Sequence, residues 1–197
     1  MRIGLDMDEV LAQFLASFIV FHNERYNTEH KLEDIDEFEL WKVWGGTREE
    51  ISERIIQFAD EGKIAELNPV PMAQKIIEEL KKDNELFVIT ARHDAGRELS
   101  ERWLEEHFPE TFKGLHMSND SHPENGSGKS KAEICKDLKI DVMVEDSYTY
   151  SERIAKFGIP VILLNYSWNI NKPETENIYR ADNWSKVPEL INSIIKK

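Results

Sequence analysis

The stretch Ile3-Gly4-Leu5-Asp6-Met7-Asp8-Glu9-Val10-Leu11 lies near the start of the chain and decides its fold. A short apolar run leads into two carboxylates two residues apart, and apolar residues then resume. A buried strand that ends at a functional site has this pattern, because such strands exclude Asp unless a partner or a metal binds it. Asp6 and Asp8 share a face if the chain stays extended, and lie side by side if it turns. Both geometries suit Mg²⁺, which prefers oxygen ligands, whereas two solvated acids at a strand end remain the alternative.

The composition is that of a soluble globular protein with one sizeable core. The chain has 197 residues, of which 40% are hydrophobic and 32% charged. Its net charge of −13 argues against binding a nucleic-acid polymer or an anionic membrane, but is compatible with a small phosphorylated substrate. Cys135 is the sole cysteine, so we expect no intrachain disulfide and a reducing, cytoplasmic compartment. Residues 10–21 are apolar, but they lack a basic leader and are too few to span a bilayer. The oligomeric state is left open.

The segment after the opening stretch predicts a helical insertion. Apolar residues keep a helical period from Leu11 to His22, and residues 27–39 indicate a loop with a short helical piece. Thr47 begins a capping box for a helix that runs to about Asp60, before two prolines end helical structure near residue 70. The buried side of this helix is expected to carry Ile51, Ile55, Ile56 and Phe58. We therefore expect a helical cap over residues 15–70, inserted into a core domain of residues 1–14 and 71–197.

From Met72 onward, helical and strand patterns alternate. The expected strands are 85–89, 112–117, 142–144 and 161–164, and the expected helices are 73–82, 94–106, 130–138, 148–157 and 184–195. This alternation predicts an α/β, Rossmann-like fold with a parallel sheet and helices on both faces.

Three of the apolar strands end in polar signatures. These are Asp6-Met7-Asp8, Thr90-Ala91-Arg92 and Glu145-Asp146-Ser147. In an open parallel sheet, ligands bind outside the carboxyl ends of the strands, so all three signatures are expected to meet in one crevice.

The chemistry that these groups suit is phosphoryl transfer. Asp6 can serve as the nucleophile and Asp8 as general acid and then base. Glu145 and Asp146 can serve as metal ligands, and Thr90 can donate a hydrogen bond to a phosphate oxygen. A lysine at a helix start can add a positive charge.

The whole pattern resembles the haloacid dehalogenase superfamily of aspartate-nucleophile phosphatases. Its Asp-x-Asp strand, strand-end Thr, helix Lys and strand-end acidic pair are matched by Asp6 with Asp8, Thr90, Lys131 (or Lys129), and Glu145 with Asp146. A narrower similarity is to the 5′(3′)-deoxyribonucleotidase-like family. It is carried by residues 6–12, Ile89-Thr90-Ala91-Arg92, Glu145-Asp146-Ser147, residues 158–162 and Trp168-Asn169. Glu9 and Gln13 stand where that family usually has glycine and aspartate.

The resemblance implies a mechanism and a substrate class. It implies Mg²⁺ held by Asp6, the Asp8 backbone carbonyl and Asp146, and an aspartyl-phosphate intermediate formed on Asp6. The implied enzyme is a phosphomonoesterase, specifically a 5′-nucleotidase acting on nucleoside monophosphates. Two alternatives stay open, namely a phosphatase for another small metabolite and a non-catalytic protein that binds a nucleotide or a partner.

Several residues have more than one interpretation. Lys131 is preferred to Lys129 as the motif lysine because it opens the helix. Residues 126–130 end like a P-loop, but Pro123 stands where that pattern requires glycine. Arg92 can contact a phosphate or pair with an acid. Trp41 and Trp44 can bind substrate by stacking on a base, or can be part of the cap interior.

Overall fold

A computed structural model describes residues 1–120 and 128–195 of the chain. A six-stranded, all-parallel sheet has the strand order β3-β2-β1-β4-β5-β6. The strands are β1 (Arg2–Leu5), β2 (Glu85–Thr90), β3 (Phe112–Met117), β4 (Val142–Glu145), β5 (Val161–Leu164) and β6 (Ile178–Ala181). The opening stretch thus forms a central strand, as an apolar run buried on both faces predicts.

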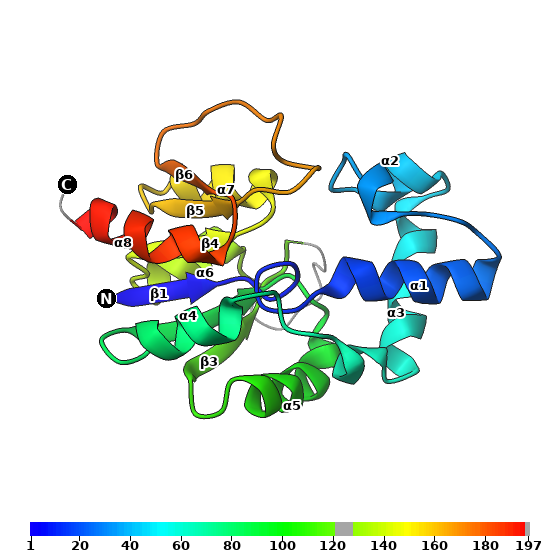
Figure 1. The fold of residues 1–197 in the computed structure, drawn as a ribbon, viewed down its shortest axis with the longest axis horizontal. Helices are drawn as coiled ribbons and strands as arrows, with labels where there is room; N and C mark the ends of the chain where they lie inside the picture. The colour runs from blue at the N-terminus through cyan, green and yellow to red at the C-terminus, as the bar shows by residue number, and fades with distance from the viewer. Residues whose placement is uncertain (121–127, 196–197) are drawn as a thin grey trace.

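Helices cover both faces of this sheet (Figure 1). The α-helices are α1 (Phe14–Tyr26), α2 (Leu40–Trp44), α3 (Arg48–Asp60), α4 (Ala73–Leu80), α5 (Arg97–His107), α6 (Lys131–Asp137), α7 (Tyr148–Ala155) and α8 (Val187–Ile195). Short 3₁₀ turns occupy residues 32–34, 63–66, 94–96 and 184–186. The predicted Rossmann-like α/β fold is therefore confirmed.

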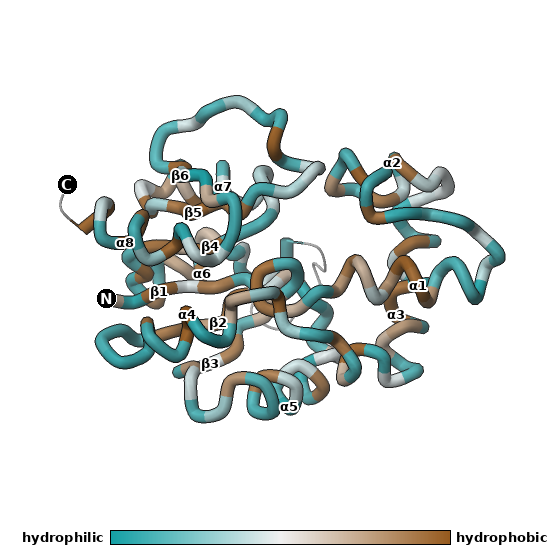
Figure 2. The backbone as a smooth tube through the Cα atoms, viewed as in Figure 1, coloured by the Kyte–Doolittle hydropathy of each residue, from teal (hydrophilic) through white to brown (hydrophobic). Residues whose placement is uncertain are grey.

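Two apolar layers sandwich the sheet, because successive strand residues face opposite sides. On β4, Val142 and Val144 belong to the layer that includes α4 and α8, whereas Met143 belongs to the layer that includes α6 and α7. The strands accordingly form an apolar centre edged by hydrophilic loops (Figure 2). At Gly4 in β1 a Cβ would lie 2.7 Å from the Met143 sulfur, so any larger residue would force this buried side chain to move.

The two chain segments that join the insertion to the core, residues 11–12 and 69–70, pair with each other. Ala12 bridges Pro69, and the Val70 amide donates to the Leu11 carbonyl at 2.8 Å. Helices α1, α2 and α3 extend from this point, to one side of the sheet (Figure 1). We use the word cap for residues 15–70; the exact division between cap and core stays a prediction.

Three details of the sequence-based prediction were wrong. The first helix begins at Phe14 and not near Leu11, because the preceding backbone is committed to a turn and to the bridge with Pro69. Ile56 is 47% exposed rather than on the buried side of α3. Strand β6 was not predicted; it is a short, half-buried edge strand with an arginine in its four residues. Residues 122–128 are polar in the sequence, which predicts a loop, and all of them except Gly128 lie outside the described residues.

No helix in the described part of the chain combines the length and the apolar character that a membrane span requires.

Candidate active site

Asp6 directly follows β1 and is buried, with only 6% of its surface exposed. Its Oδ2 lies 2.8 Å from Nζ of Lys131, whereas its Oδ1 is buried and has no hydrogen-bond partner among the described residues. Burial raises the pKa of Asp6 to about 7, although the Lys131 ammonium opposes this shift. A buried carboxylate oxygen without a partner is costly, so this position favours a ligand or a cation.

Lys131 is the first residue of α6, and local sequence fixes it there. Ser130 caps the helix and forms a reciprocal capping box with Glu133, while Asp120 accepts from the Lys131 amide at 2.6 Å. The Lys131 side chain is buried, and its ammonium pairs with Asp6 and Glu145. Burial alone would lower its pKa, but these carboxylates outweigh burial and raise the pKa.

Lys129 lies elsewhere. Its ammonium pairs with Asp137 at 2.5 Å, and both side chains are about half exposed, at 52% and 53%. The structure therefore brings Lys131, and not Lys129, to the Asp6 carboxylate.

Glu145 ends β4 and is fully buried. Its Oε2 accepts from the backbone amides of Asp146 and Ser147, at 2.8 and 2.7 Å, and its Oε1 accepts from Lys131. Both carboxylate oxygens therefore have partners, and Glu145 fixes the turn that follows the strand.

Asp146 is also buried, and it lies next to these acids. Burial raises its pKa, and the negative charges of Glu145 and Asp6 raise it further. The indole N–H of Trp168 donates to Asp146 Oδ2 at 3.1 Å. Asp6, Glu145 and Asp146, here called the acidic cluster, each offer an oxygen within 4.8 Å of the others.

The acidic cluster fits a hard divalent cation. Three ionised carboxylates and the Lys131 ammonium would leave a net charge of about −2 in a buried place, which is unfavourable without a counterion. Mg²⁺ prefers oxygen ligands, and Asp6 Oδ1, to which no described group donates a hydrogen bond, is such a ligand.

Asp8 and Arg92 form a bidentate pair. Arg92 Nε and Nη2 lie 2.9 and 2.5 Å from the two oxygens of Asp8, and Nη1 donates to Ser100 Oγ at 3.0 Å. The sequence allowed Arg92 to contact a phosphate or to pair with an acid, and in the structure it pairs with the acid Asp8. Thr90, the last residue of β2, is buried, and its hydroxyl accepts from the Arg92 amide at 3.2 Å.

The two cap tryptophans have different surroundings. Trp44 stacks on His30, with ring centres 4.4 Å apart and planes 5° apart, and also packs against Phe18. Trp41 is half-buried and lies beneath the guanidinium of Arg48, 5.9 Å from its ring centre. A role for either ring in substrate binding stays a prediction.

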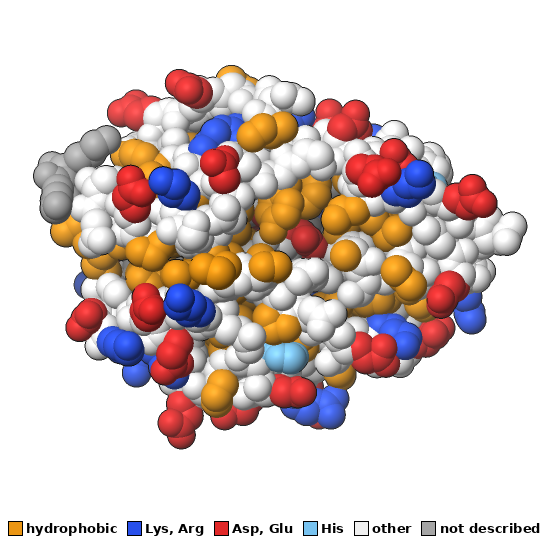
Figure 3. Space-filling view, in the orientation of Figure 1, with side chains coloured by type: hydrophobic (Ala, Val, Ile, Leu, Met, Phe, Trp, Pro, Cys, Tyr) orange, Lys and Arg blue, Asp and Glu red, His pale blue; other side chains and the backbone are white. Residues whose placement is uncertain are grey.

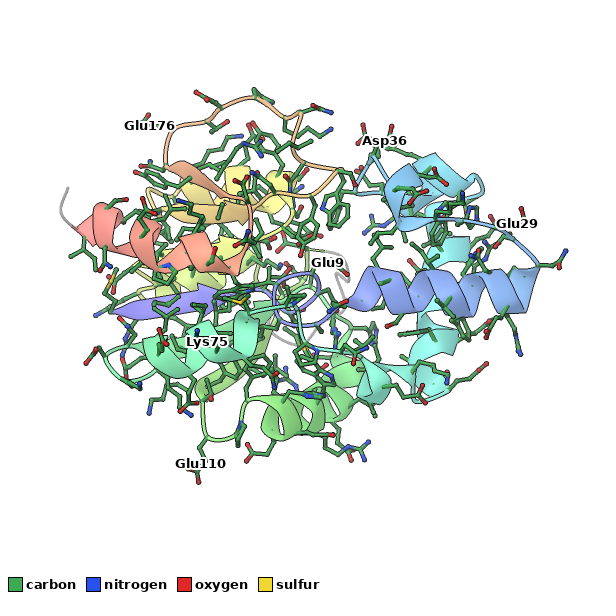
Figure 4. All side chains as sticks on the ribbon, viewed as in Figure 1. Glu9, Glu29, Asp36, Lys75, Glu110 and Glu176 are labelled. Carbon is green, nitrogen blue, oxygen red and sulfur yellow. The ribbon has the colours of Figure 1, made fainter. Side chains whose placement is uncertain are left out.

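Sequence reasoning gave no role to Glu9, although it named this residue as unusual. Its φ of 59° is left-handed, a conformation that glycine adopts more readily than glutamate. The Leu15 amide donates to Glu9 Oε1 at 2.5 Å, and burial raises the pKa of Glu9 to about 8. Glu9 therefore connects the Asp-x-Asp turn to the first turn of α1, between the core and the cap (Figure 4).

A hollow opens between the core and the cap (Figure 3). Apolar side chains gather around it, and an acidic side chain is visible inside. The polar strand ends meet at this end of the sheet, as predicted from the Asp-x-Asp, Thr and acidic-pair signatures.

The sheet and the helices that cover it have the architecture of haloacid dehalogenase-like proteins, as two solved structures illustrate. A haloacid dehalogenase-like hydrolase from Streptococcus pneumoniae superposes with a TM-score of 0.68 at 14% identity, over 96% of this chain and 97% of that one. A HAD-hydrolase from Bacillus subtilis, YfnB, solved bound to magnesium, gives 0.65 at 15% identity, over 97% and 98% of the two chains.

Residues 1–197 match the family described as "5' nucleotidase, deoxy (Pyrimidine), cytosolic type C protein", and the chain belongs to this family. A relative from Bacillus subtilis, described as "Putative nucleotidase YqfW", is 30% identical over 196 residues, which are 98% of this chain and 94% of the relative. The chain is thus a phosphoric monoester hydrolase of the nucleotidase type.

Proposed function

We propose that the chain is a Mg²⁺-dependent 5′-nucleotidase that transfers the phosphoryl group of its substrate to Asp6. One observation carries this proposal. One oxygen of Asp6 is held by a buried ammonium. The other is buried beside two more carboxylates and has no hydrogen-bond partner in the part of the chain that the structure describes. A carboxylate held in this way is oriented for attack before the substrate arrives.

The first half of the reaction forms a covalent intermediate. An Asp6 oxygen attacks the phosphorus, and the bond from phosphorus to the ester oxygen breaks. Asp8 gives its proton to the leaving alkoxide, which departs as the nucleoside alcohol. Lys131 stabilises the negative charge on the reacting oxygens, and the Thr90 hydroxyl donates to a phosphate oxygen.

The second half restores the enzyme. Asp8, now a carboxylate, takes a proton from water, and the water oxygen attacks the phosphorus of the aspartyl phosphate. The bond from Asp6 to phosphorus breaks, which releases inorganic phosphate and regenerates Asp6. Arg92 holds Asp8 through the bidentate contact while Asp8 is a carboxylate. One of these two contacts has to break when Asp8 carries the proton that it donates.

Asp6, Asp146 and the backbone carbonyl of Asp8 would hold the cation, with Glu145 beside them. Glu145 already bonds Lys131 and two backbone amides, so its contribution is to hold this arrangement together. When bound, Mg²⁺ acts as a Lewis acid on a phosphoryl oxygen and neutralises charge on the acidic cluster.

The proposed substrate is a nucleoside monophosphate that enters the hollow between core and cap. The family description supports this substrate class, and the apolar surround of the hollow offers a surface for a base. The same description supports the expected cytoplasmic location.

Phosphate release from a panel of monoesters, in Mg²⁺ and in EDTA, tests the proposal. We expect nucleoside monophosphates to be hydrolysed in Mg²⁺ and not in EDTA. Preference for a different metabolite would support the alternative phosphatase, and no release from any monoester would support a non-catalytic binding protein.

A further inference from the structure

A short loop after β5 contacts the Asp-x-Asp turn, the cap and Asp146. Residues 166–169 follow one another in the sequence, and each side chain donates a hydrogen bond to a group outside the loop. The acceptors are the Glu9 carbonyl for Tyr166 at 2.6 Å, the Ile35 carbonyl of the cap for Ser167, Asp146 Oδ2 for Trp168 at 3.1 Å, and the Asp146 carbonyl for Asn169 at 2.8 Å. The loop therefore fixes Asp146 at both its backbone and its carboxylate.

The contact from Trp168 to Asp146 is buried and directional. Trp168 is 4% exposed and Asp146 is 3% exposed, so water does not compete strongly for this hydrogen bond. An indole has a single N–H donor and no acceptor, so Trp168 can satisfy one oxygen of the carboxylate and thereby sets its rotation.

Trp168 is itself held tightly. Its ring stacks on Tyr166, with centres 4.5 Å apart and planes 4° apart. The Asn169 amide also donates to the Leu164 carbonyl at 2.7 Å, which ties the loop to the end of β5. The indole N–H is therefore a fixed donor rather than a mobile one.

The neutrality of this donor suits a cation site. A hydrogen bond to an ionised carboxylate favours its charged form. An arginine or lysine in the same place would also do so, but its positive charge would oppose a metal cation. The indole supports the charge of Asp146 without adding a cation to the acidic cluster.

We propose that Trp168 is a positioning residue that orients the Asp146 carboxylate toward the bound cation. This inference rests on the proposed function, which requires that cation. Partners that orient metal ligands change metal affinity by about 10- to 100-fold when they are removed.

The test is the affinity of the metal-free protein for Mg²⁺, measured by isothermal titration calorimetry. Trp168→Phe keeps an aromatic ring against Tyr166 but removes the N–H. Trp103→Phe is the matched control, because Trp103 is equally buried and its indole donates to the Leu67 carbonyl at 2.8 Å. We expect Trp168→Phe to weaken Mg²⁺ binding about tenfold or more, and Trp103→Phe to leave it unchanged.

A second readout separates positioning from general damage. In steady-state kinetics, Trp168→Phe should raise the Mg²⁺ concentration for half-maximal rate much more than the KM for substrate. Thermal unfolding in EDTA measures how far each variant is destabilised without metal. If Trp168→Phe does not fold, NMR of the unaltered protein replaces it. The indole N–H resonance of Trp168 should shift on Mg²⁺ addition, and that of Trp103 should not.

The outcomes distinguish this inference from the proposed function. Equal Mg²⁺ affinity of Trp168→Phe and the unaltered protein, or an unmoved Trp168 resonance while Mg²⁺ binds, would overturn this inference alone. If the unaltered protein bound no Mg²⁺, both the proposed function and this inference would be wrong.

Discussion

The Lys131 ammonium lies 2.8 Å from Oδ2 of Asp6, and the two side chains are only 2% and 9% exposed. Such a pair is expensive to bury, and its value for stability alone is doubtful. Lys131 also contacts Glu145, so a fixed positive charge sits between two acids before any substrate binds. Fixed charge of this kind needs no rearrangement during a reaction in which charge develops, and this is how enzymes stabilise transition states.

Asp6→Asn should fold and lose nearly all turnover, because an amide cannot replace the carboxylate nucleophile. Asp8→Asn should lose about 10²- to 10⁴-fold, the usual loss for a general acid and base. Asp137→Asn is the control, because Asp137 pairs with a lysine at the surface. Phosphate release at saturating Mg²⁺ is the measurement. Retention of more than about a tenth of the rate by Asp6→Asn would contradict the covalent mechanism.

Lys131→Ala should lower kcat by about 10²- to 10³-fold, because it removes a preorganised charge beside the nucleophile. Lys129→Ala should change kcat little, since Lys129 pairs with Asp137 at the surface. The two variants make the same chemical change two residues apart, so their comparison isolates position. A larger loss of kcat in Lys129→Ala than in Lys131→Ala would show that Lys129, and not Lys131, is the motif lysine.

Local chemistry explains which features could be predicted from sequence. The box of Thr47 with Glu50 and the apolar run before Asp6 act within a few residues, and the structure has both. The start of α1 could not be read in this way, because Ala12 is held by Pro69, far along the chain.

The same distinction between local signals and long-range contacts applies to the candidate site. The polar strand ends were predictable because parallel topology brings them together. The contact of Trp168 with Asp146 and the pairing of Arg92 with Asp8 join residues that are 22 and 84 positions apart. No periodicity or cap signal specifies such contacts, which depend on where loops lie in the folded chain.

Stability should fall in acid partly through His22 in the cap. Burial, and to a smaller extent the nearby Arg54 guanidinium, together lower the pKa of this histidine from 6.5 to about 4. Arg54 donates to Nε2 at 2.8 Å, and Nδ1 lies 3.0 Å from the Thr28 hydroxyl, so the ring is bonded as a neutral imidazole.

Between pH 6.5 and about 4, the unfolded chain binds a proton at His22 that the folded chain does not. This contribution is therefore complete above pH 6.5 and is lost as the pH falls toward 4, at no more than about 1.4 kcal/mol per pH unit. Urea unfolding from pH 4.5 to 7.5 should show a flatter pH dependence for His22→Gln than for the unaltered protein. His93→Gln is the control, because His93 lies in the core domain and not in the cap. Parallel curves for His22→Gln and the unaltered protein would show that His22 does not titrate in this way.

The substrate prediction is that nucleoside 5′-monophosphates, deoxypyrimidine ones among them, are hydrolysed better than sugar phosphates. The phosphate gives no discrimination, because every monoester has one. A base stacked on an aromatic ring gains about 1–3 kcal/mol. If the contact persists in the transition state, this equals a factor of roughly 5 to 150 in kcat/KM.

Comparing kcat/KM for thymidine and uridine monophosphates with that for glucose and glycerol phosphates, at saturating Mg²⁺, measures this factor. Equal values, or a preference for a sugar phosphate, would leave a general phosphatase and exclude the nucleotidase. If nucleotides are preferred and the Trp41 ring contacts the base, Trp41→Ala should reduce kcat/KM selectively for the nucleotides. Trp44→Ala is a harsher change, because Trp44 stacks on His30 and packs on Phe18 inside the cap. A uniform loss over all substrates in Trp44→Ala would therefore indicate damage to the cap, whereas a loss confined to nucleotides would place this ring at the base.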